Sequence, residues 1–492
     1  MMRRVLAAGL LTAVLASCAP PPQAPAPPPP PAPDLARDLA GKVGTDGIYN
    51  HLKKFAAIAA ANKGTRADGT PGYQASVDYV ANLLRDKGFD VQTPEYVRVE
   101  RGAPGNPVLD VGGRRWSVVQ ASLLTSTAPG GLTAPTLHPV KPAGCAPDDY
   151  GTLNLRGAIA VVDDAVCSVV DKQNAAVARG AVAVLVVSPP SANGAPRGLF
   201  SPGYYEHLNT PVGIIGKDAD AVLLKTNTPV KLTLDAKNTG VKSRNVLAQT
   251  KTGDQHSVVL AGAHLDSAPT SAGINDAATG VSALLETAAA LGGSPKIENA
   301  VRFTFWGSGA VGQEGATKYV RALAAEPLND IALYLDFDIL GSPNAGFFTF
   351  DGDQSGQANP EIPLDAVPAG SAGLERTLAG YLYLAGKRPA DMTMDLGSGY
   401  GPFLTAGIPV GGISTGTSQR KTPIQARLWG GQVGAAFDPG YGPTGDTVEQ
   451  LNRSALAVTG PAVAFAVGTY AQSLTGPNGV PLHDQRHRQA GK

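Results

Sequence analysis

The sequence predicts an α/β protein with a mostly parallel sheet sandwiched by helices and an inserted small strand-rich unit. Two observations carry this prediction. From residue 240 onward, apolar runs such as "HSVVLAGA" and "NAVRFTFWG" alternate with helical patterns such as "GVSALLETAAAL", which is typical of parallel sheets covered by helices. Residues 102–239 instead hold short apolar runs, among them "GAIAVVDD" and "PVGIIG", between many Pro and Gly residues.

The N-terminus reads as an export signal. Two arginines precede a short apolar run that ends in the sequence Leu-Ala-Ser before Cys18, which is the order of a signal peptide over residues 1–17. This ending resembles the lipobox of bacterial lipoproteins, in which the cysteine becomes the lipidated first residue. The alternative is an ordinary cleaved signal in which Cys18 is incidental. The arginine pair fits twin-arginine export and an ordinary basic leader equally well.

Residues 18–34 form a proline-rich linker. The stretch "APPPQAPAPPPPPAPD" favours polyproline II and cannot build a core. We expect it to hold a folded body away from a membrane, with the lipid as the only membrane attachment and no later segment that spans. The expected location is therefore the extracytoplasmic side of a bacterial cell envelope.

Changes in composition and in the pattern of apolar residues predict four segments in the body of the chain. A first part of the larger domain is expected over 35–101, the strand-rich unit over 102–239, the second part of the larger domain over 240–475, and a loose polar C-terminal tail over 476–492. Lys and Arg total 40, and Asp and Glu also total 40. This balance gives no electrostatic case for a nucleic-acid partner.

The remaining cysteines are Cys145 and Cys167, both in the strand-rich unit. An even pair in an exported protein predicts a disulfide. The alternative is two free buried thiols.

Ligand-type side chains gather where buried strands end. His264 closes "HSVVLAGA", and Asp266 could support its imidazole from behind. Asp276 precedes a helix and could be a ligand or a helix cap. Asp336 and Asp338 end "DIALYLDFDIL" on one face of a strand. One His and two Asp make a credible zinc set with an open position for water.

Five motifs in order resemble the di-zinc aminopeptidases, the family whose relatives include glutamate carboxypeptidase II and the transferrin receptor. The motifs are "AGAHLDSAP…GINDAATG", "VRFTFWG…G", "YLDFDILGSPN", "GPFLTAGIPVGGI" and "FDPGYG…GDT". The strand-rich unit is similar to the protease-associated domain inserted in many members. The chain is most similar to actinobacterial lipoprotein aminopeptidases. The resemblance implies a zinc exopeptidase-like fold.

The resemblance assigns one complete set of zinc ligands. It places His264 and Asp338 on one zinc, Asp276 between two zincs, and Asp266 behind the histidine. The private ligands of the second zinc are absent, because Ala310 stands at the glutamate position and Gly442 at the histidine position. Gly309 stands where the family has its general base, and Gly399 replaces an aspartate near the substrate.

Replacement ligands are scarce. No histidine occurs between His264 and His483, and Glu314, one helical turn beyond Ala310, is more typical of a solvated helix face. We therefore expect at most one zinc ion and a catalytically degenerate protein that binds a peptide or protein of the cell envelope. The alternative is an active zinc-dependent aminopeptidase or peptide hydrolase that uses a single metal.

Overall fold

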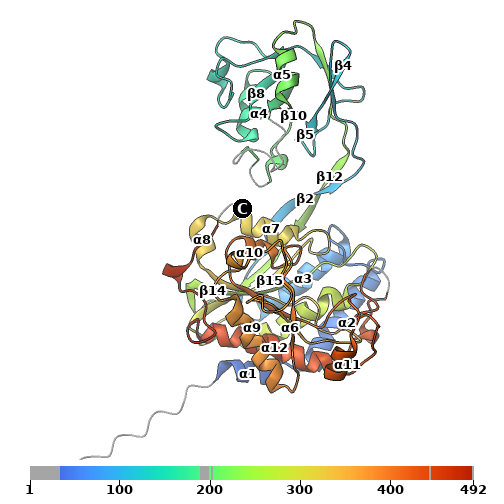
Figure 1. The fold of residues 1–492 in the computed structure, drawn as a ribbon, viewed down its shortest axis with the longest axis vertical. Coiled ribbons are helices and arrows are strands. Elements are labelled where there is room, and N and C mark those ends of the chain that lie inside the picture. The colour runs from blue at the N-terminus through green and yellow to red at the C-terminus, as the bar shows by residue number, and fades with distance from the viewer. Residues whose placement is uncertain (1–33, 189–198, 201–202, 443–444, 490–492) are drawn as a thin grey trace, which may run out of the picture. The chain divides into compact units, whose positions relative to one another are not determined.

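The computed structural model describes residues 34–188, 199–200, 203–442 and 445–489. The predicted signal peptide over 1–17, Cys18 and the linker up to residue 33 lie outside these residues, so the lipid anchor stays a prediction. The chain divides into the units Met1–Asp34 and Leu35–Lys492, and the second holds the fold (Figure 1).

The larger domain is built on an eight-stranded sheet in the order β1-β13-β15-β14-β16-β19-β17-β18. Strands β15, β14, β16 and β19 pair in parallel at its centre, whereas β1, β13 and β17 join antiparallel. The predicted α/β class is confirmed, with antiparallel strands added toward the edges. The strands are β1 (Asp90–Gln92), β13 (Val246–Gln249), β14 (Asp254–His264), β15 (Asn299–Trp306), β16 (Ile331–Asp336), β17 (Phe348–Phe350), β18 (Ala390–Met392) and β19 (Val410–Ser414).

Helices cover the sheet in the two layers that strand alternation requires. Along β14, Val259 and Ala261 belong to the core beneath α2, α6 and α12, whereas Leu260 belongs to the core beneath α7 and α10. The helices of this domain are α1 (Leu35–Lys42), α2 (Thr45–Ala61), α3 (Pro71–Asp86), α6 (Thr279–Leu291), α7 (Glu314–Ala322), α8 (Ala325–Asn329), α9 (Ser371–Leu384), α10 (Gly401–Thr405), α11 (Pro423–Trp429) and α12 (Arg453–Gln472).

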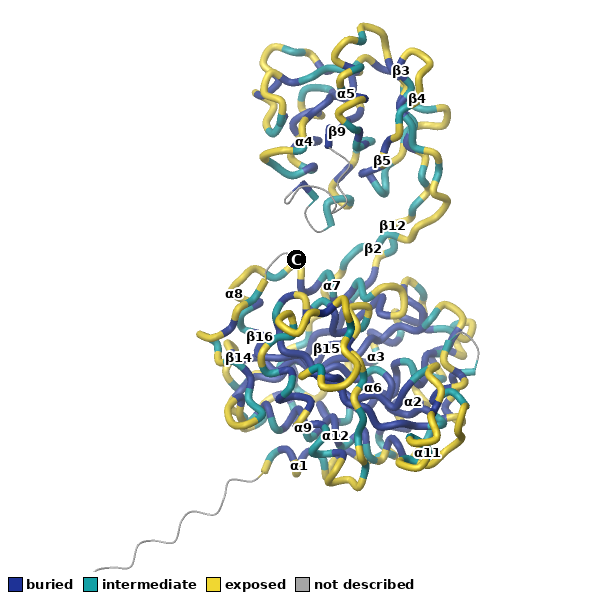
Figure 2. Tube along the Cα trace, viewed as in Figure 1, coloured by how far each residue is buried: buried dark blue, intermediate teal, exposed yellow. Residues whose placement is uncertain are grey.

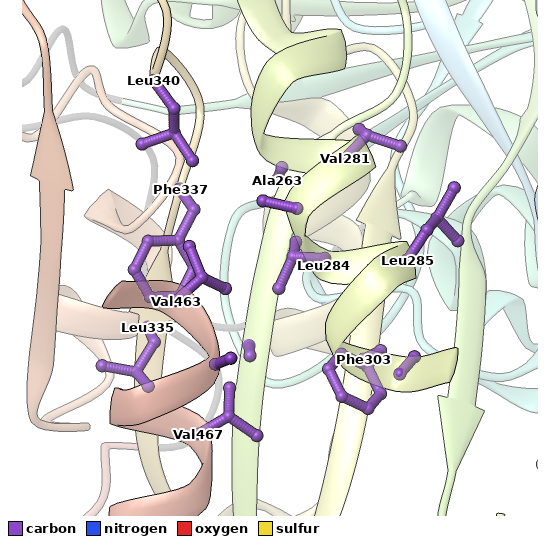
Figure 3. Close-up of a cluster of buried hydrophobic side chains, with 14 of the residues drawn as sticks. Ala263, Val281, Leu284, Leu285, Phe303, Leu335, Phe337, Leu340, Val463 and Val467 are labelled. Atoms are coloured by element: carbon purple, nitrogen blue, oxygen red, sulfur yellow. The ribbon is translucent and has the colours of Figure 1, made fainter. Parts of the chain in front are cut away.

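The main core lies between the central strands and helices α6 and α12. Figure 3 shows Phe337 and Leu335 of the β16 segment directed toward Val463 and Val467 of α12, with Leu284 of α6 beside them. All five side chains are fully buried, and the central strands stand out as the buried part of this domain (Figure 2). Burial of apolar surface stabilises the fold by about 25 cal/mol per Å². Because β14 and β16 pack in this core, their carboxyl ends, which carry the candidate site, are held in place.

The length and composition of helix α12 suffice for a membrane span, contrary to the expectation that no body segment is apolar enough. It is the only such helix among the residues described. Its most apolar window is 67% buried within the fold, and α12 packs against α1, α6 and α9. It is therefore a core helix of the domain.

The inserted domain contains two sheets. One has the order β5-β10-β9-β8-β7 and the other β4-β3-β11-β6. The ribbon of β2 (Glu95–Arg101) and β12 (Asn238–Arg244) carries the chain in and out. Its other elements are β3 (Val108–Val111), β4 (Arg114–Ser117), β5 (Val119–Gln120), β6 (Leu132–Ala134), β7 (Thr136–Leu137), β8 (Ile159–Asp163), α4 (Val169–Ala178), β9 (Ala183–Val187), β10 (Val212–Ile215), α5 (Lys217–Leu223) and β11 (Val230–Thr233).

The predicted disulfide between Cys145 and Cys167 is present, with Cα atoms 5.9 Å apart. The ammonium group of Lys172 on α4 supports it by donating hydrogen bonds to the carbonyl oxygens of Ala143 and Ala165, at 2.8 and 2.7 Å. The segments that contain Cys145 and Cys167 are thus held together both by the disulfide and by the hydrogen bonds of Lys172.

The expectation of a loose C-terminal tail is wrong for residues 476–489. Val480 and Arg486 are buried, and the guanidinium of Arg488 donates to the carbonyl oxygen of Ile331 at 2.6 Å. The tail docks through hydrogen bonds from arginine side chains to backbone carbonyl oxygens near the start of β16. Such contacts need no apolar periodicity, so the sequence pattern did not reveal them.

Candidate functional site

The candidate site lies at the carboxyl edge of the parallel strands. His264 is the last residue of β14, and Asp338 follows β16 by two residues. Because β14 and β16 are neighbouring parallel strands, with Gly262 opposite Asp336, their carboxyl ends meet at one edge, where α/β sheets bind ligands.

A cavity of about 500 Å³ opens at this edge. It brings together all three predicted zinc ligands and the three residues that stand at the predicted positions of the base and of the second zinc's private ligands. These six lining residues are His264, Asp276, Asp338, Gly309, Ala310 and Gly442. These six residues, from four of the sequence motifs, therefore line one cavity.

The imidazole of His264 is held from both sides. Its Nε2 donates to Oδ1 of Asp276 at 2.8 Å, and its Nδ1 donates to the backbone carbonyl oxygen of Asp266 at 3.0 Å. Burial opposes protonation of this ring, but the carboxylates of Asp338, Asp266 and Asp276 outweigh it and hold the pKa of His264 well above its usual range. The imidazolium of His264 and the carboxylate of Asp276 therefore form an ion pair.

Asp338 is placed by the backbone of the neighbouring strand. Its Oδ1 accepts a hydrogen bond from the backbone N–H of His264 at 3.0 Å. Asp336 is 2% exposed and accepts a hydrogen bond from the hydroxyl of Tyr334 at 2.8 Å. Burial raises the pKa of both carboxyl groups. Asp338 thus keeps one oxygen free of that contact, whereas Asp336 is engaged with the core.

The three predicted ligands fit one zinc ion in type but are not gathered around one point. Among the described residues, two other groups of three hold one ligand atom each within 4.8 Å of one another. Zinc held by His264, Asp276 and Asp338 would replace the proton on Nε2 of the imidazole, because a histidine ligand is neutral.

Asp266 contacts both the imidazole of His264 and a neighbouring turn. Its carbonyl oxygen orients His264, while its carboxylate lies 3.5 Å from Nδ1. That carboxylate accepts hydrogen bonds from the backbone N–H groups of Gly309 at 2.7 Å and Ala310 at 3.2 Å. Asp266 therefore couples the histidine to the turn that stands where the family has its two glutamates.

The residues at the missing positions offer no ligand atoms. Gly309 is buried against His264, and Ala310 is exposed on the same turn. Gly442 has φ +115°, with no atom within 4 Å of an added Cβ. At Gly399, an added Cβ would lie 3.0 Å from Oδ2 of Asp336. Glu314 begins α7 and is not among the described residues that line the cavity.

Sequence reasoning assigned no role to Asp446, although it lies in the "GDT" motif. Its two carboxylate oxygens accept hydrogen bonds from the backbone N–H groups of Asn275 at 2.6 Å and Asp276 at 3.3 Å. Burial raises the pKa of Asp446 to about 6. Asp438 of "FDPGYG" accepts from the Asn275 amide at 2.6 Å. The last motif therefore positions the loop that presents Asp276.

Fold and site define a zinc-peptidase-like protein with an inserted domain. The Peptidase family M28 model matches residues 245–467, and the PA domain model matches residues 132–223. The chain is 46% identical over 469 residues to "Probable lipoprotein aminopeptidase LpqL" of Mycobacterium tuberculosis, covering 93% of this chain and 91% of that protein. It is 33% identical over 435 residues to an aminopeptidase of Pseudomonas aeruginosa, covering 85% and 79%.

Among solved structures, a zinc aminopeptidase from Bacillus subtilis matches with a TM-score of 0.49 and 22% identity, covering 90% of this chain and 99% of that chain. From the sequence relatives, this chain belongs to peptidase family M28. Membership implies zinc as the metal of the site. The resemblance predicted from the motifs is thereby confirmed, including the inserted protease-associated domain.

Proposed function

We propose that this chain is a catalytically degenerate M28 protein whose cavity binds a peptide or protein of the cell envelope. One observation carries the proposal. The base position and both private ligand positions of the second zinc are occupied by Gly309, Ala310 and Gly442, and all three line the same cavity as His264. A loss concentrated on one metal and its base removes catalysis while it leaves the cavity in place.

The energetic argument supports this proposal. A positioned general base contributes about 10²–10⁴-fold to a rate, and a second metal ion stabilises transition-state charge by several kcal/mol more. Neither glycine nor alanine offers a lone pair for either task. We infer at most one zinc in this cavity, held by His264, Asp276 and Asp338, because Asp276 alone is too few ligands for a second ion.

The test combines metal counting with turnover. The purified chain and a His264→Ala variant are dialysed against zinc chloride, and the zinc that His264→Ala loses is counted as cavity zinc. Both proteins are then assayed on a panel of aminoacyl substrates. We expect a loss of no more than one ion and turnover far below the ordinary ~1–10³ s⁻¹ of enzymes.

Two outcomes would overturn the proposal. A loss of two ions in His264→Ala would show that the second zinc is retained through other ligands. Ordinary turnover that requires His264 while a single cavity ion is bound would instead establish the one-metal hydrolase, for which three protein ligands and water is a known geometry.

A peptide-binding role has its own measurement. Immobilised peptide libraries are screened for retention of the wild-type chain, with Ala268→Trp as a variant that fills the cavity, since Ala268 lines it. We expect the variant to lose peptides that the wild type retains. Equal retention by both would contradict binding in this cavity.

We also propose that the mature protein starts at Cys18 and is held on the envelope by lipid on that residue. The support is the Leu-Ala-Ser-Cys sequence and the similarity to a relative named as a lipoprotein. A single acyl chain binds only marginally, so stable attachment needs more than one. Cys18→Ser should move the protein to the soluble fraction, and unchanged membrane retention would contradict the anchor.

A further inference from the structure

A second cluster of ligand-type side chains lies at the opposite edge of the same sheet. It consists of His256 near the start of β14, Asp330 just before β16, and His483 in the C-terminal segment. His256 precedes His264 by eight residues on one strand, or about 26 Å at ~3.3 Å per residue. The two histidines cannot share an ion.

Both imidazoles point at the same carboxylate oxygen. Nδ1 of His256 lies 2.9 Å from Oδ1 of Asp330, and Nε2 of His483 lies 3.3 Å from that oxygen. One atom from each of the three residues lies within 4.8 Å of the other two. The two rings meet edge to face with centroids 5.8 Å apart. The ligand atoms are thus gathered more closely than those of the candidate active site.

Hydrogen bonds outside the cluster hold its three segments together. The guanidinium of Arg486 donates to the carbonyl oxygens of His256 at 2.9 Å, Asn329 at 2.7 Å and Asp330 at 3.2 Å. The amide of Asn329 donates to the carbonyl oxygen of His483 at 3.0 Å. Supporting contacts of this kind orient ligands before the metal arrives.

The surrounding charge favours a cation. Oε1 of Glu326 lies 4.0 Å from Nε2 of His483, and Oδ1 of Asp254 accepts from the backbone N–H of His256 at 3.0 Å. With Asp330 these make three carboxylates near the rings, and Arg486 directs its guanidinium to backbone carbonyls. Neutral imidazoles would leave the cluster net negative, which attracts a divalent ion.

We propose that His256, Asp330 and His483 form a binding site for a divalent transition-metal ion, with zinc as the probe. Two imidazole nitrogens and one carboxylate suit zinc and its neighbours in the first transition row, and they do not suit Ca²⁺ or Mg²⁺, which prefer oxygen ligands. Because His483 lies in the C-terminal segment, His256 in β14 and Asp330 directly before β16, the bound ion ties that segment to the sheet.

The test removes the candidate active-site histidine first, so that the two sites are read separately. Zinc chloride is titrated by calorimetry into the purified full-length His264→Ala chain, and into the same chain carrying His256→Ala, Asp330→Asn or His483→Ala. We expect His264→Ala to bind one zinc at this site. We expect each second change to weaken that binding at least tenfold.

A matched control is His138→Ala in the His264→Ala chain. His138 forms a comparable pair with Asp220, 2.8 Å from Nε2 to Oδ1, but it belongs to no group of three ligands among the described residues. We expect this control to keep zinc binding. The side chain of His256 is 69% exposed, so its removal should leave the fold intact, which circular dichroism checks.

Hydrogen exchange gives an independent readout. Zinc should slow exchange of amides in the segment 481–489 of His264→Ala and should have no such effect once His256→Ala is added. The proposal is overturned by either of two results: no zinc binding by His264→Ala, or equal binding after His256→Ala. Neither result bears on zinc in the candidate active site, which is read from the loss that His264→Ala itself causes.

Discussion

The Cα of Gly309 lies so close to the side chain of His264 that an added Cβ would sit 2.5 Å from Cγ and 3.1 Å from Nδ1 of the imidazole. The backbone N–H of Gly309 is held in this position by Oδ1 of Asp266 at 2.7 Å. Glycine is therefore required for the local packing, because the imidazole of His264 occupies the space that a side chain at position 309 would need. If Gly309 stands at the family's base position, as we propose, a side chain there would clash with the imidazole of His264.

Restoring a glutamate at Gly309 should consequently damage the protein. We expect Gly309→Glu to lower the free energy of unfolding by about 1–3 kcal/mol, the usual cost of overpacking, measured by urea denaturation. Ala310→Glu is the matched control, because Ala310 is exposed on the same turn and surface changes usually stay within about 0.5 kcal/mol. Equal stability of the two variants would show that the turn relaxes freely.

Adding ligands without the base should restore metal but not catalysis. Ala310→Glu together with Gly442→His supplies two new ligands beside Asp276. Gly442 has open space, but its φ of +115° disfavours a side chain, at a cost of roughly 1–2 kcal/mol. We expect metal analysis to count one additional zinc in the cavity and turnover to stay at the level of the unmodified chain. Turnover at ordinary enzymatic rates would show that Gly309 is not the limiting loss.

Removing the disulfide should weaken the inserted domain. Cys145 and Cys167 are 22 residues apart, and closing a loop of this length contributes about 3 kcal/mol in the chain-entropy model. The double change to serine should therefore speed hydrogen exchange in β8 and α4 and leave exchange in β14 unchanged. The Lys172 hydrogen bonds to Ala143 and Ala165 remain, so Lys172→Met should add to the effect. Unaltered exchange in β8 would contradict this prediction.

Glu375 on α9 should make stability depend on pH. Burial raises its pKa to about 7 from 4.5, and the charges of Asp353, Asp391 and Asp351 reinforce the shift. The protonated form is therefore favoured by folding. The stability it contributes is complete below about pH 4.5 and is lost as pH rises through about 7. The full loss is at most on the order of 3 kcal/mol and is reduced by solvent screening.

Glu375→Gln should remove this loss. Its free energy of unfolding relative to wild type should rise between pH 4.5 and 8, measured by denaturation with a chelator present, since a cation bound to Asp351, Asp353 and Glu375 would mask the effect. Glu449→Gln is the control, because Glu449 is exposed. A difference between Glu375→Gln and wild type that is constant with pH would contradict the assigned shift.

Local patterns predicted much of the fold. The helical pattern "GVSALLETAAAL" predicted α6, where Val281, Leu284 and Leu285 are buried together. The continuous apolar run before His264 predicted β14, because a central strand of a parallel sheet is buried on both faces. The docked tail was missed because Arg486 and Arg488 bind backbone carbonyls, and such contacts depend on long-range neighbours that polar sequence does not reveal.

By itself the sequence determined which chemical groups are present in this protein. It showed that His264, Asp276 and Asp338 are present and that the side chains of Gly309, Ala310 and Gly442 offer no ligand, and it predicted that Cys145 and Cys167 form a disulfide. Only the tertiary structure decided how these groups stand in space. It paired His264 with Asp276, packed Gly309 against the imidazole, and brought His483 to Asp330 across 153 residues. Side-chain identity is local information, whereas distances between strand ends are set by the packing of the whole core.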